Sequence, residues 1–189
     1  MRNEQAAQPS ELADAVLISI RSRFVRSILA GTKTFELRRK IPQSPVGRLL
    51  VVYSSGEDRA ITACGRVSGV TSDTPSAVWN KHKNHLGVSR EEFEAYFEGS
   101  TTAHALHLED VAAIPRRLTL KELRSEHGLE PPQSWRYLSQ KLCRQLLEAL
   151  DPSVKPSAGD AGGGTVLLDY GCTPGDVTVE FGVDPEVGP

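Results

Sequence analysis

The chain has 189 residues, of which 39% are hydrophobic, and a formal net charge of −2, which fits one globular domain with extensions. No stretch approaches the eighteen or so consecutive apolar residues of a membrane-spanning helix, so the sequence predicts no membrane partner. The three cysteines are widely spaced and form no CxxC pair. This pattern argues against a disulfide framework or a zinc ribbon and favours the reducing cytoplasm.

The sequence divides into three segments by composition. Residues 1–14 are polar and predict a flexible leader without the apolar core of a signal peptide. Residues 15–150 carry regular strand and helix patterns and predict one domain. Residues 151–189 are rich in glycine and proline and carry seven acids against one base, which is typical of a disordered acidic tail. Two short apolar runs in this tail, at 165–170 and 177–183, predict transient strands.

The domain begins with a predicted strand, helix and strand. Residues 16–20 are short, apolar and β-branched, as in a strand. Residues 21–30 predict an amphipathic helix that ends at Gly31, because glycine tolerates the left-handed backbone conformation. Residues 34–39 predict the second strand. The predicted buried side of the helix consists of Phe24, Val25, Ile28 and Leu29.

Three further segments predict strands. Residues 49–53 are almost continuously apolar and predict a central strand. Residues 61–70 contain Gly65 and Gly69, which indicates a bend or a bulge. Residues 102–114 alternate loosely and predict a long strand. The strands do not alternate regularly with helices, so we expect no doubly wound parallel sheet but an α+β fold: a small, mostly antiparallel β-barrel with helices packed around it.

Signals at helix N-termini predict four more helices. Thr74 is followed by proline, which favours a helix start. Capping boxes predict the next two starts at Ser89 and Thr119, each with glutamate three residues later. The last helix is predicted from about 135 to 150, with Ser134 as its cap and leucines along one face. Trp79, Phe93, Tyr96 and Phe97 have helical spacing and predict core positions.

Basic residues concentrate between residues 21 and 48. This segment contains eight basic residues and one acidic residue, Glu36, whereas the tail is strongly acidic. A basic concentration of this kind favours a polyanionic partner, although a solvated charged face is the alternative. The bases are Arg21, Arg23, Arg26, Lys33, Arg38, Arg39, Lys40 and Arg48.

The turn and strand from residue 29 to 40 carry the strongest candidate site. Alternation along the strand places Glu36 and Arg38 on one side and the apolar residues on the other. Lys33 shares the apolar side, so we expect it to emerge at the mouth of the strand, where its ammonium reaches a phosphate. Arg38 offers a planar fork that matches phosphate. Glu36 either accepts hydrogen bonds from a base or only holds Arg38 at the strand edge.

Other candidate ligand contacts lie just outside this strand. Arg21 and Arg23 lie at the start of the preceding helix. In one interpretation they contact phosphate, and in the other they are ordinary solvated charges. The end of a predicted strand carries Tyr53, Ser54 and Ser55. We expect their hydroxyl groups to contact a ligand bound in a cleft there. Tyr53 stacks on a base in this interpretation, and packs in the core in the alternative one.

No cofactor is predicted, although a divalent metal remains possible for a nuclease. His82 and His85 are three residues apart on a probable helix but lack a third ligand. His104 and His107 have odd spacing on a strand and therefore face opposite sides. The sequence contains no GxSxG, P-loop, GxGxxG or HExxH motif.

Residues 28–38, Ile-Leu-Ala-Gly-Thr-Lys-Thr-Phe-Glu-Leu-Arg, contain the pattern Gly-x-Lys-x-x-Glu-x-Arg. This pattern resembles the signature of the ASCH domains, a branch of the PUA-like superfamily. Further landmarks follow in the order of that family, at residues 51–55, 64–67, 87–99 and 131–135. The resemblance covers residues 16–138 and leaves the tail outside.

The resemblance implies a pseudo-β-barrel with a ligand cleft between barrel and helices. ASCH and PUA-like domains are known mainly for binding RNA or modified bases, and some are hydrolases or nucleases. The small ASCH amidohydrolases use a lysine with a threonine three residues later. Here Glu36 stands three residues after Lys33, which departs from that pattern.

The sequence therefore predicts a cytoplasmic nucleic-acid-binding ASCH domain, with RNA or single strands favoured over duplex DNA. The expected contacts are Gly31 at the turn, the Tyr53 to Ser55 hydroxyls, and the charged residues Arg21, Arg23, Lys33, Glu36, Arg38 and Arg39. The first alternative is a hydrolase, either a nuclease or an amidohydrolase on a modified nucleoside, with Lys33 and Glu36 as catalytic residues. The second is a regulatory module that senses a small ligand. The oligomeric state and the choice between RNA-binding and DNA-binding stay open.

Overall fold

The computed structural model describes residues 15–151, 165–168 and 177–180. The predicted leader and most of the predicted disordered tail lie outside these residues. The helices are α1 (Ser22–Leu29), α2 (Pro75–His82), α3 (Arg90–Phe97), α4 (Leu120–His127) and α5 (Gln140–Leu150), with a 3₁₀ turn η2 (Lys83–His85). The strands are β1 (Ala15–Arg21), β2 (Phe35–Arg38), β3 (Leu49–Ser55), β4 (Ala60–Asp73), β5 (Ala103–Thr119), β6 (Trp135–Leu138), β7 (Thr165–Leu168) and β8 (Val177–Glu180).

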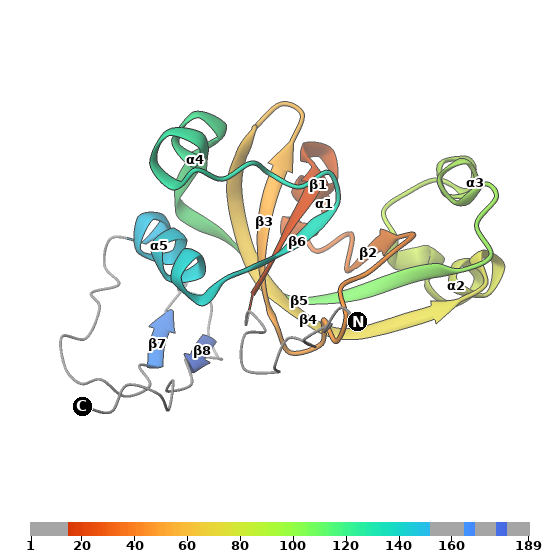
Figure 1. Ribbon diagram of the computed structural model, residues 1–189. Coiled ribbons are helices and arrows are strands. Elements are labelled where there is room, and N and C mark those ends of the chain that lie inside the picture. Colours follow the sequence, from red (N-terminus) through yellow and green to blue (C-terminus); the bar gives the residue numbers. More distant parts are fainter. Residues whose placement is uncertain (1–14, 152–164, 169–176, 181–189) are drawn as a thin grey trace, which may run out of the picture.

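Strands β1 to β6 form one curled sheet in the order β2-β5-β4-β3-β1-β6 (Figure 1). Only β1 and β3 pair in parallel among these strands, and the other pairs are antiparallel. The predicted α+β fold with a mostly antiparallel, barrel-like sheet and surrounding helices is therefore confirmed. Strands β7 and β8 of the tail segment pair with each other in a separate antiparallel ladder.

Strand β4 curls because its register against β5 shifts three times, between 61 and 63, 64 and 66, and 67 and 69. Gly65 lies at the second shift, and a Cβ there would come within 2.7 Å of the Val111 side chain. Only glycine lets the two backbones approach this closely, which agrees with the bulge predicted from sequence.

The two edges of the sheet are linked by side chains instead of a backbone ladder. Trp135 in β6 donates its indole N–H to the Lys40 carbonyl oxygen over 3.1 Å. Tyr137, also in β6, donates its hydroxyl to the Gln43 carbonyl oxygen over 2.7 Å. Both acceptors lie in the chain that follows β2. These contacts bring the edges together and leave the half-barrel open at one end.

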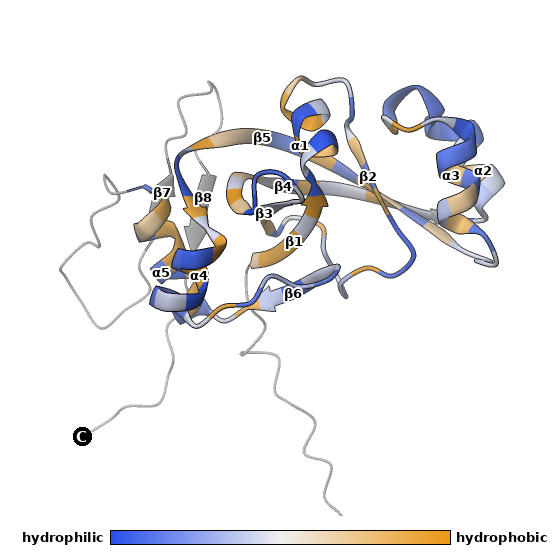
Figure 2. Ribbon diagram, turned by 90° about the horizontal axis from the view of Figure 1, so that it is seen from above, coloured by the Kyte–Doolittle hydropathy of each residue, from blue (hydrophilic) through white to orange (hydrophobic). Residues whose placement is uncertain are grey.

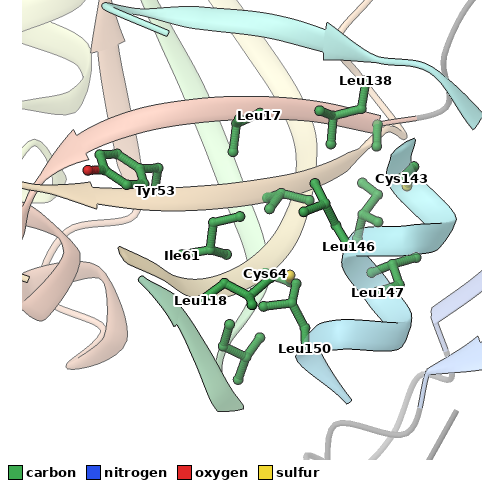
Figure 3. Packing of buried hydrophobic residues seen from close by; sticks show 14 of the residues in the cluster. Leu17, Tyr53, Ile61, Cys64, Leu118, Leu138, Cys143, Leu146, Leu147 and Leu150 are labelled. Carbon is green, nitrogen blue, oxygen red and sulfur yellow. The ribbon is translucent and has the colours of Figure 1, made fainter. Parts of the chain in front are cut away.

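Helix α5 covers the core of the half-barrel. Its Cys143, Leu146, Leu147 and Leu150 are buried against strand residues that include Leu17, Ile61 and Cys64 (Figure 3). A second buried cluster lies under α1, and a third joins α2 and α3 to β2 and β5. Figure 2 shows strand β1 as largely hydrophobic and the outlying helix α3 as mostly hydrophilic. The apolar central strands therefore take the most enclosed positions.

The predicted helix starts at Thr74, Ser89 and Thr119 are confirmed, since each of these side chains accepts a backbone N–H of its helix. The prediction of a single helix over 135–150 is wrong in its first part. Residues 135–138 form β6, which pairs with β1, and α5 begins only after Ser139. Tertiary pairing of an aromatic segment overrides the helical pattern here.

The buried side of α1 is also smaller than predicted. Val25 and Ile28 are buried, whereas Phe24 is half-buried and Leu29 is 39% exposed. Leu29 is the last residue of the helix, where the chain turns away toward β2. The last turn therefore extends beyond the core that the rest of α1 covers.

We expect Ser139→Ala to lower the free energy of unfolding by about 1 kcal/mol, because the Ser139 hydroxyl accepts the Leu142 N–H at the start of α5. Urea unfolding of the purified chain measures the change. Ser125→Ala, at an exposed position inside α4, is the control and should change stability by only a few tenths of a kcal/mol. Equal stability of the two variants would show that Ser139 does not cap α5.

Candidate functional site

A pocket of about 870 Å³ opens beside the ends of β1 and β3, and we call it the central pocket. Its walls come from β1, β2, α1, α3, α4 and the loop before β6, so segments more than a hundred residues apart meet there. The volume falls in the range of small-molecule and cofactor sites. Seven residues predicted from sequence line it, namely Arg21, Arg23, Lys33, Glu36, Arg38, Tyr53 and Ser55.

Lys33 forms part of the floor and is almost completely buried. Its ammonium donates to the carbonyl oxygens of Phe35 and Leu86, each over 2.7 Å, and lies 3.4 Å from a Glu36 carboxylate oxygen. Burial lowers the pKa of Lys33, and the Glu36 carboxylate opposes this effect. The expectation that Lys33 emerges at the mouth of the strand is therefore wrong, because two buried carbonyl groups hold its ammonium inside.

The chain beside Lys33 is shaped to leave room for it. Gly87 has a φ of +62°, and a Cβ at this position would lie 2.8 Å from the Lys33 Cβ. Glycine is thus required both by the backbone conformation and by the close approach of the lysine stem. The Lys33 ammonium ties this segment, through Leu86, to the start of β2.

Glu36 and Arg38 continue the buried network across the floor. A terminal nitrogen of Arg38 lies 2.9 Å from a Glu36 carboxylate oxygen. The Arg38 guanidinium also donates to the Ser19 carbonyl oxygen over 2.7 Å and to the Ser134 hydroxyl over 3.1 Å. Arg38 therefore joins β2 to β1 and to the loop before β6. Its Nε is buried without a partner in the described residues, so the network is not completely satisfied.

The rim of the central pocket carries arginines in exposed ion pairs. Arg23 of α1 lies 2.7 Å from Glu92 of α3, and Arg124 of α4 lies 2.6 Å from Glu130. The side chains of these pairs are between 40% and 65% exposed. Such pairs contribute little stability in water, so a phosphate can replace the carboxylates at modest cost. Arg21 adds a further exposed cation on the same rim.

Hydroxyl groups line the other end of the central pocket. The Tyr53 side chain is 6% exposed, and its hydroxyl points away from the α5 side of the core (Figure 3). Burial raises the pKa of the Tyr53 phenol, and the nearby Arg59 guanidinium opposes this effect. The phenol therefore stays protonated at neutral pH and acts as a donor. Ser55 and Ser134 also line the pocket.

Three residues predicted for the site do not line the central pocket. Gly31 has a φ of +72° and ends α1 as expected. Arg39 lies over the Tyr96 ring and donates to the Tyr96 carbonyl oxygen over 2.6 Å. Ser54 is fully buried and its hydroxyl is shared with Ser22 and Asp58.

Sequence reasoning missed several residues of the pocket. Arg124, Glu130 and Ser134 line it, although they follow the Lys33 motif by about ninety residues or more. The sequence predicts Ser134 as a helix cap, whereas the cap of α5 is Ser139 and Ser134 lines the central pocket. The sequence predicts a core position for Tyr96, but this residue is 41% exposed and lines the pocket. A local sequence pattern does not indicate which distant segments lie side by side. These contacts therefore follow only from the pairing of the strands in the folded sheet.

The histidines make local hydrogen bonds away from the central pocket. His104 and His107 contact the hydroxyls of Ser72 and Ser68, and His82 contacts that of Thr71. Within the described ranges no group of three or more histidine, cysteine, aspartate or glutamate side chains has the arrangement of a metal site. In the same residues no helix is long and apolar enough to cross a membrane.

Comparison with known proteins identifies relatives. The family model described as "Domain of unknown function (DUF365)" matches residues 13–128. A curated protein of Zymomonas mobilis subsp. mobilis, named ASCH domain-containing ribonuclease, is 27% identical over 133 residues, which is 69% of this chain and 88% of that protein.

Solved structures agree on the fold. The crystal structure of ASCH from Zymomonas mobilis matches with a TM-score of 0.68 and 24% identity, covering 73% of this chain and 96% of that chain. A serine-to-alanine mutant of that protein matches with a TM-score of 0.69 and 22% identity, covering 75% and 99%. A tyrosine-to-phenylalanine mutant gives a TM-score of 0.68 at 23% identity. These similarities confirm the ASCH-type, PUA-like fold expected from the sequence.

We expect Arg38→Ala to lower the free energy of unfolding by about 3–5 kcal/mol, because it leaves the Glu36 carboxylate buried with less compensation and removes the links to Ser19 and Ser134. Urea unfolding followed by circular dichroism measures the loss.

Arg39→Ala is the matched control, since Arg39 is the next residue along the chain and is exposed. We expect its effect to stay near 1 kcal/mol or below. If Arg38→Ala were as stable as Arg39→Ala, the buried network would not support the fold in the way described.

Proposed function

The chain belongs to the DUF365 family and has the fold of an ASCH domain, and on this premise we propose that it binds single-stranded RNA in the central pocket and cleaves it. The observation that carries the proposal is the meeting of a cationic rim and a donor hydroxyl in one pocket. Arg21, Arg23 and Arg124 supply the cations, and the Tyr53 phenol supplies the donor. We place this activity in the cytoplasm, which the three widely spaced cysteines of the sequence favour.

The relatives support RNA as the ligand. The curated relative is named a ribonuclease, and two crystallised forms of the structural relative exchange a tyrosine for phenylalanine and a serine for alanine. Each exchange removes one hydroxyl. The central pocket of this chain presents the hydroxyls of Tyr53 and Ser134. Single-stranded RNA suits the site, because an unpaired base can leave the strand and enter a pocket.

In the proposed reaction the 2′-hydroxyl of the bound ribose attacks the adjacent phosphate and loses its proton to water, and the bond to the 5′-oxygen of the next nucleotide breaks. Water then returns a proton to Tyr53, which has protonated the leaving oxygen. The products are a 2′,3′-cyclic phosphate and a 5′-hydroxyl. Arg59 and Arg124 neutralise the charge that grows on the phosphate oxygens. The Tyr53 phenol, protonated at neutral pH, donates a proton to the leaving oxygen. DNA lacks the 2′-hydroxyl and is therefore not a substrate.

Lys33 and Glu36 have a positioning role in this proposal. The Lys33 ammonium already contacts two carbonyl oxygens and the Glu36 carboxylate, and Glu36 also contacts Arg38. Both groups are therefore already engaged by partners inside the protein. Their network instead fixes β2 and, through Arg38, the loop that presents Ser134.

The second candidate is RNA binding without cleavage, as in many PUA-like domains. One observation favours it: the carboxylates that line the central pocket, Glu36, Glu92 and Glu130, are all held in ion pairs. A carboxylate held in this way is a poor general base for the 2′-hydroxyl, because the neighbouring arginine stabilises its charged form. The denaturing gel described next separates the two candidates.

We expect the purified chain to bind and shorten labelled single-stranded RNA, and to leave single-stranded DNA and duplex DNA intact. Each reaction, with and without divalent metal, is divided between a native and a denaturing gel. The logarithm of the RNA affinity should fall with the logarithm of salt by about 0.7 per phosphate contacted. Bound but intact RNA would support the binding module, and the absence of both binding and cleavage would exclude RNA as the ligand.

We expect Tyr53→Phe to reduce the cleavage rate at least about 100-fold while RNA affinity changes only slightly, since the phenol is assigned to proton donation. Single-turnover cleavage and filter binding measure the two effects. Tyr137→Phe is the matched control, because its hydroxyl contacts Gln43 outside the central pocket. Equal cleavage rates for the two variants would remove Tyr53 from the reaction.

A further inference from the structure

A second hollow of about 620 Å³ lies next to the central pocket, at the first turns of α4 and the turn between β3 and β4. We call it the α4 hollow. It shares Leu120 and Arg124 with the central pocket, so the two cavities are adjacent at α4. Its other basic residues are Arg59 and Lys121. A ligand longer than the central pocket can therefore extend past Leu120 and Arg124 to reach the α4 hollow.

The carboxylates of the α4 hollow are held by other groups. Glu57 lies 2.9 Å from Arg26, on the side of α1. The Asp58 carboxylate accepts a hydrogen bond from the Ser54 hydroxyl, which is the main reason why its pKa is lowered. The backbone N–H of Asp58 donates to the Ser22 hydroxyl over 3.2 Å. Asp58 also lies 3.8 Å from Arg117 of β5. Both carboxylates are therefore paired with cations that do not line the α4 hollow.

Lys121 provides the cation that belongs to the α4 hollow alone. It is exposed, it lines this hollow and not the central pocket, and within the described ranges it has no ion-pair partner. Its ammonium is therefore available to a phosphate without breaking an existing pair. Arg124, by contrast, faces both cavities and is paired with Glu130.

Arg59 lies at the junction between the two cavities. It has a φ of 47°, uncommon for a residue other than glycine, and its carbonyl oxygen accepts the Leu120 N–H over 2.8 Å. This bond fixes the β3–β4 turn against the start of α4. The Arg59 side chain lines the α4 hollow, and it lies near enough to Tyr53 of the central pocket for its charge to act on the phenol. A group bridging both cavities would pass beside this guanidinium.

We propose that the α4 hollow is a second nucleotide subsite, which binds the RNA nucleotide next to the one in the central pocket. The inference rests on the proposed function, because it needs RNA in the central pocket. The phosphodiester between the two nucleotides lies between Arg59 and Arg124, and the following phosphate contacts Lys121. An RNA that fills both subsites must therefore be longer than one nucleotide. It must also carry a further phosphate after the phosphodiester that joins the two bound nucleotides.

The experiment compares Lys121→Glu with Lys81→Glu in the full chain. Lys81 is an exposed lysine of α2 that lines neither cavity, so both variants have the same change in net charge. The probes are the four nucleoside monophosphates and a mixed-sequence RNA tetranucleotide protected from cleavage by 2′-O-methyl groups. Affinities are measured by isothermal titration calorimetry, and the salt dependence is measured for the tetranucleotide.

We expect Lys121→Glu to weaken tetranucleotide binding roughly tenfold relative to Lys81→Glu and to lower its salt slope by about 0.7, which corresponds to one lost phosphate contact. Mononucleotide binding should be the same in both variants. Lys121→Ala should give a smaller loss in the same direction.

Two other outcomes overturn the proposal in distinguishable ways. Equal tetranucleotide affinities for Lys121→Glu and Lys81→Glu, with intact mononucleotide binding, would remove the second subsite and leave the proposed function standing. No binding of either probe to the unaltered chain would overturn the proposed function and the subsite together.

Discussion

The architecture depends on the buried charged network of Lys33, Glu36 and Arg38. Three charged side chains leave water in this network, and burial of such groups is costly unless their partners are nearly complete. Here backbone carbonyl groups of Phe35, Leu86 and Ser19 supply most of those partners. The network therefore fixes which segments must meet, because a shifted strand would leave a buried charge without compensation.

Closure of the half-barrel follows from the same constraint. Strands β2 and β6 lie at opposite edges of the sheet order, and side chains rather than a backbone ladder bring the edges together. Arg38 reaches from β2 to the loop before β6, where it meets Ser134. A continuous ladder would close the sheet completely. The side-chain closure instead leaves an opening, and the central pocket lies there between the first and last parts of the domain.

The two cavities give helix α4 a functional importance that its modest length does not suggest. Its first turn carries Lys121 and its middle carries Arg124, so one face of the helix borders both the central pocket and the α4 hollow. The capping box at Thr119 and the bond from Leu120 to Arg59 hold this helix end in place. The proposed phosphate contacts thus come from a firmly anchored helix. The exposed ion pairs of Arg23 and Arg124 on the rim contribute little stability, so a phosphate can replace their carboxylate partners.

The sequence by itself determined the local elements and the motif. Period-two alternation, the capping boxes and the glycine bulge correctly predicted most strands and helices, and the Lys33 to Arg38 pattern identified the fold family, because these signals depend on neighbours along the chain. Tertiary structure decided what depends on distant partners. Residues 135–138 became a strand because β1 was available for pairing, and Lys33 turned inward because buried carbonyl groups required a donor. Arg124 and Ser134 joined the site because curling of the sheet brought their segments to β1 and β3.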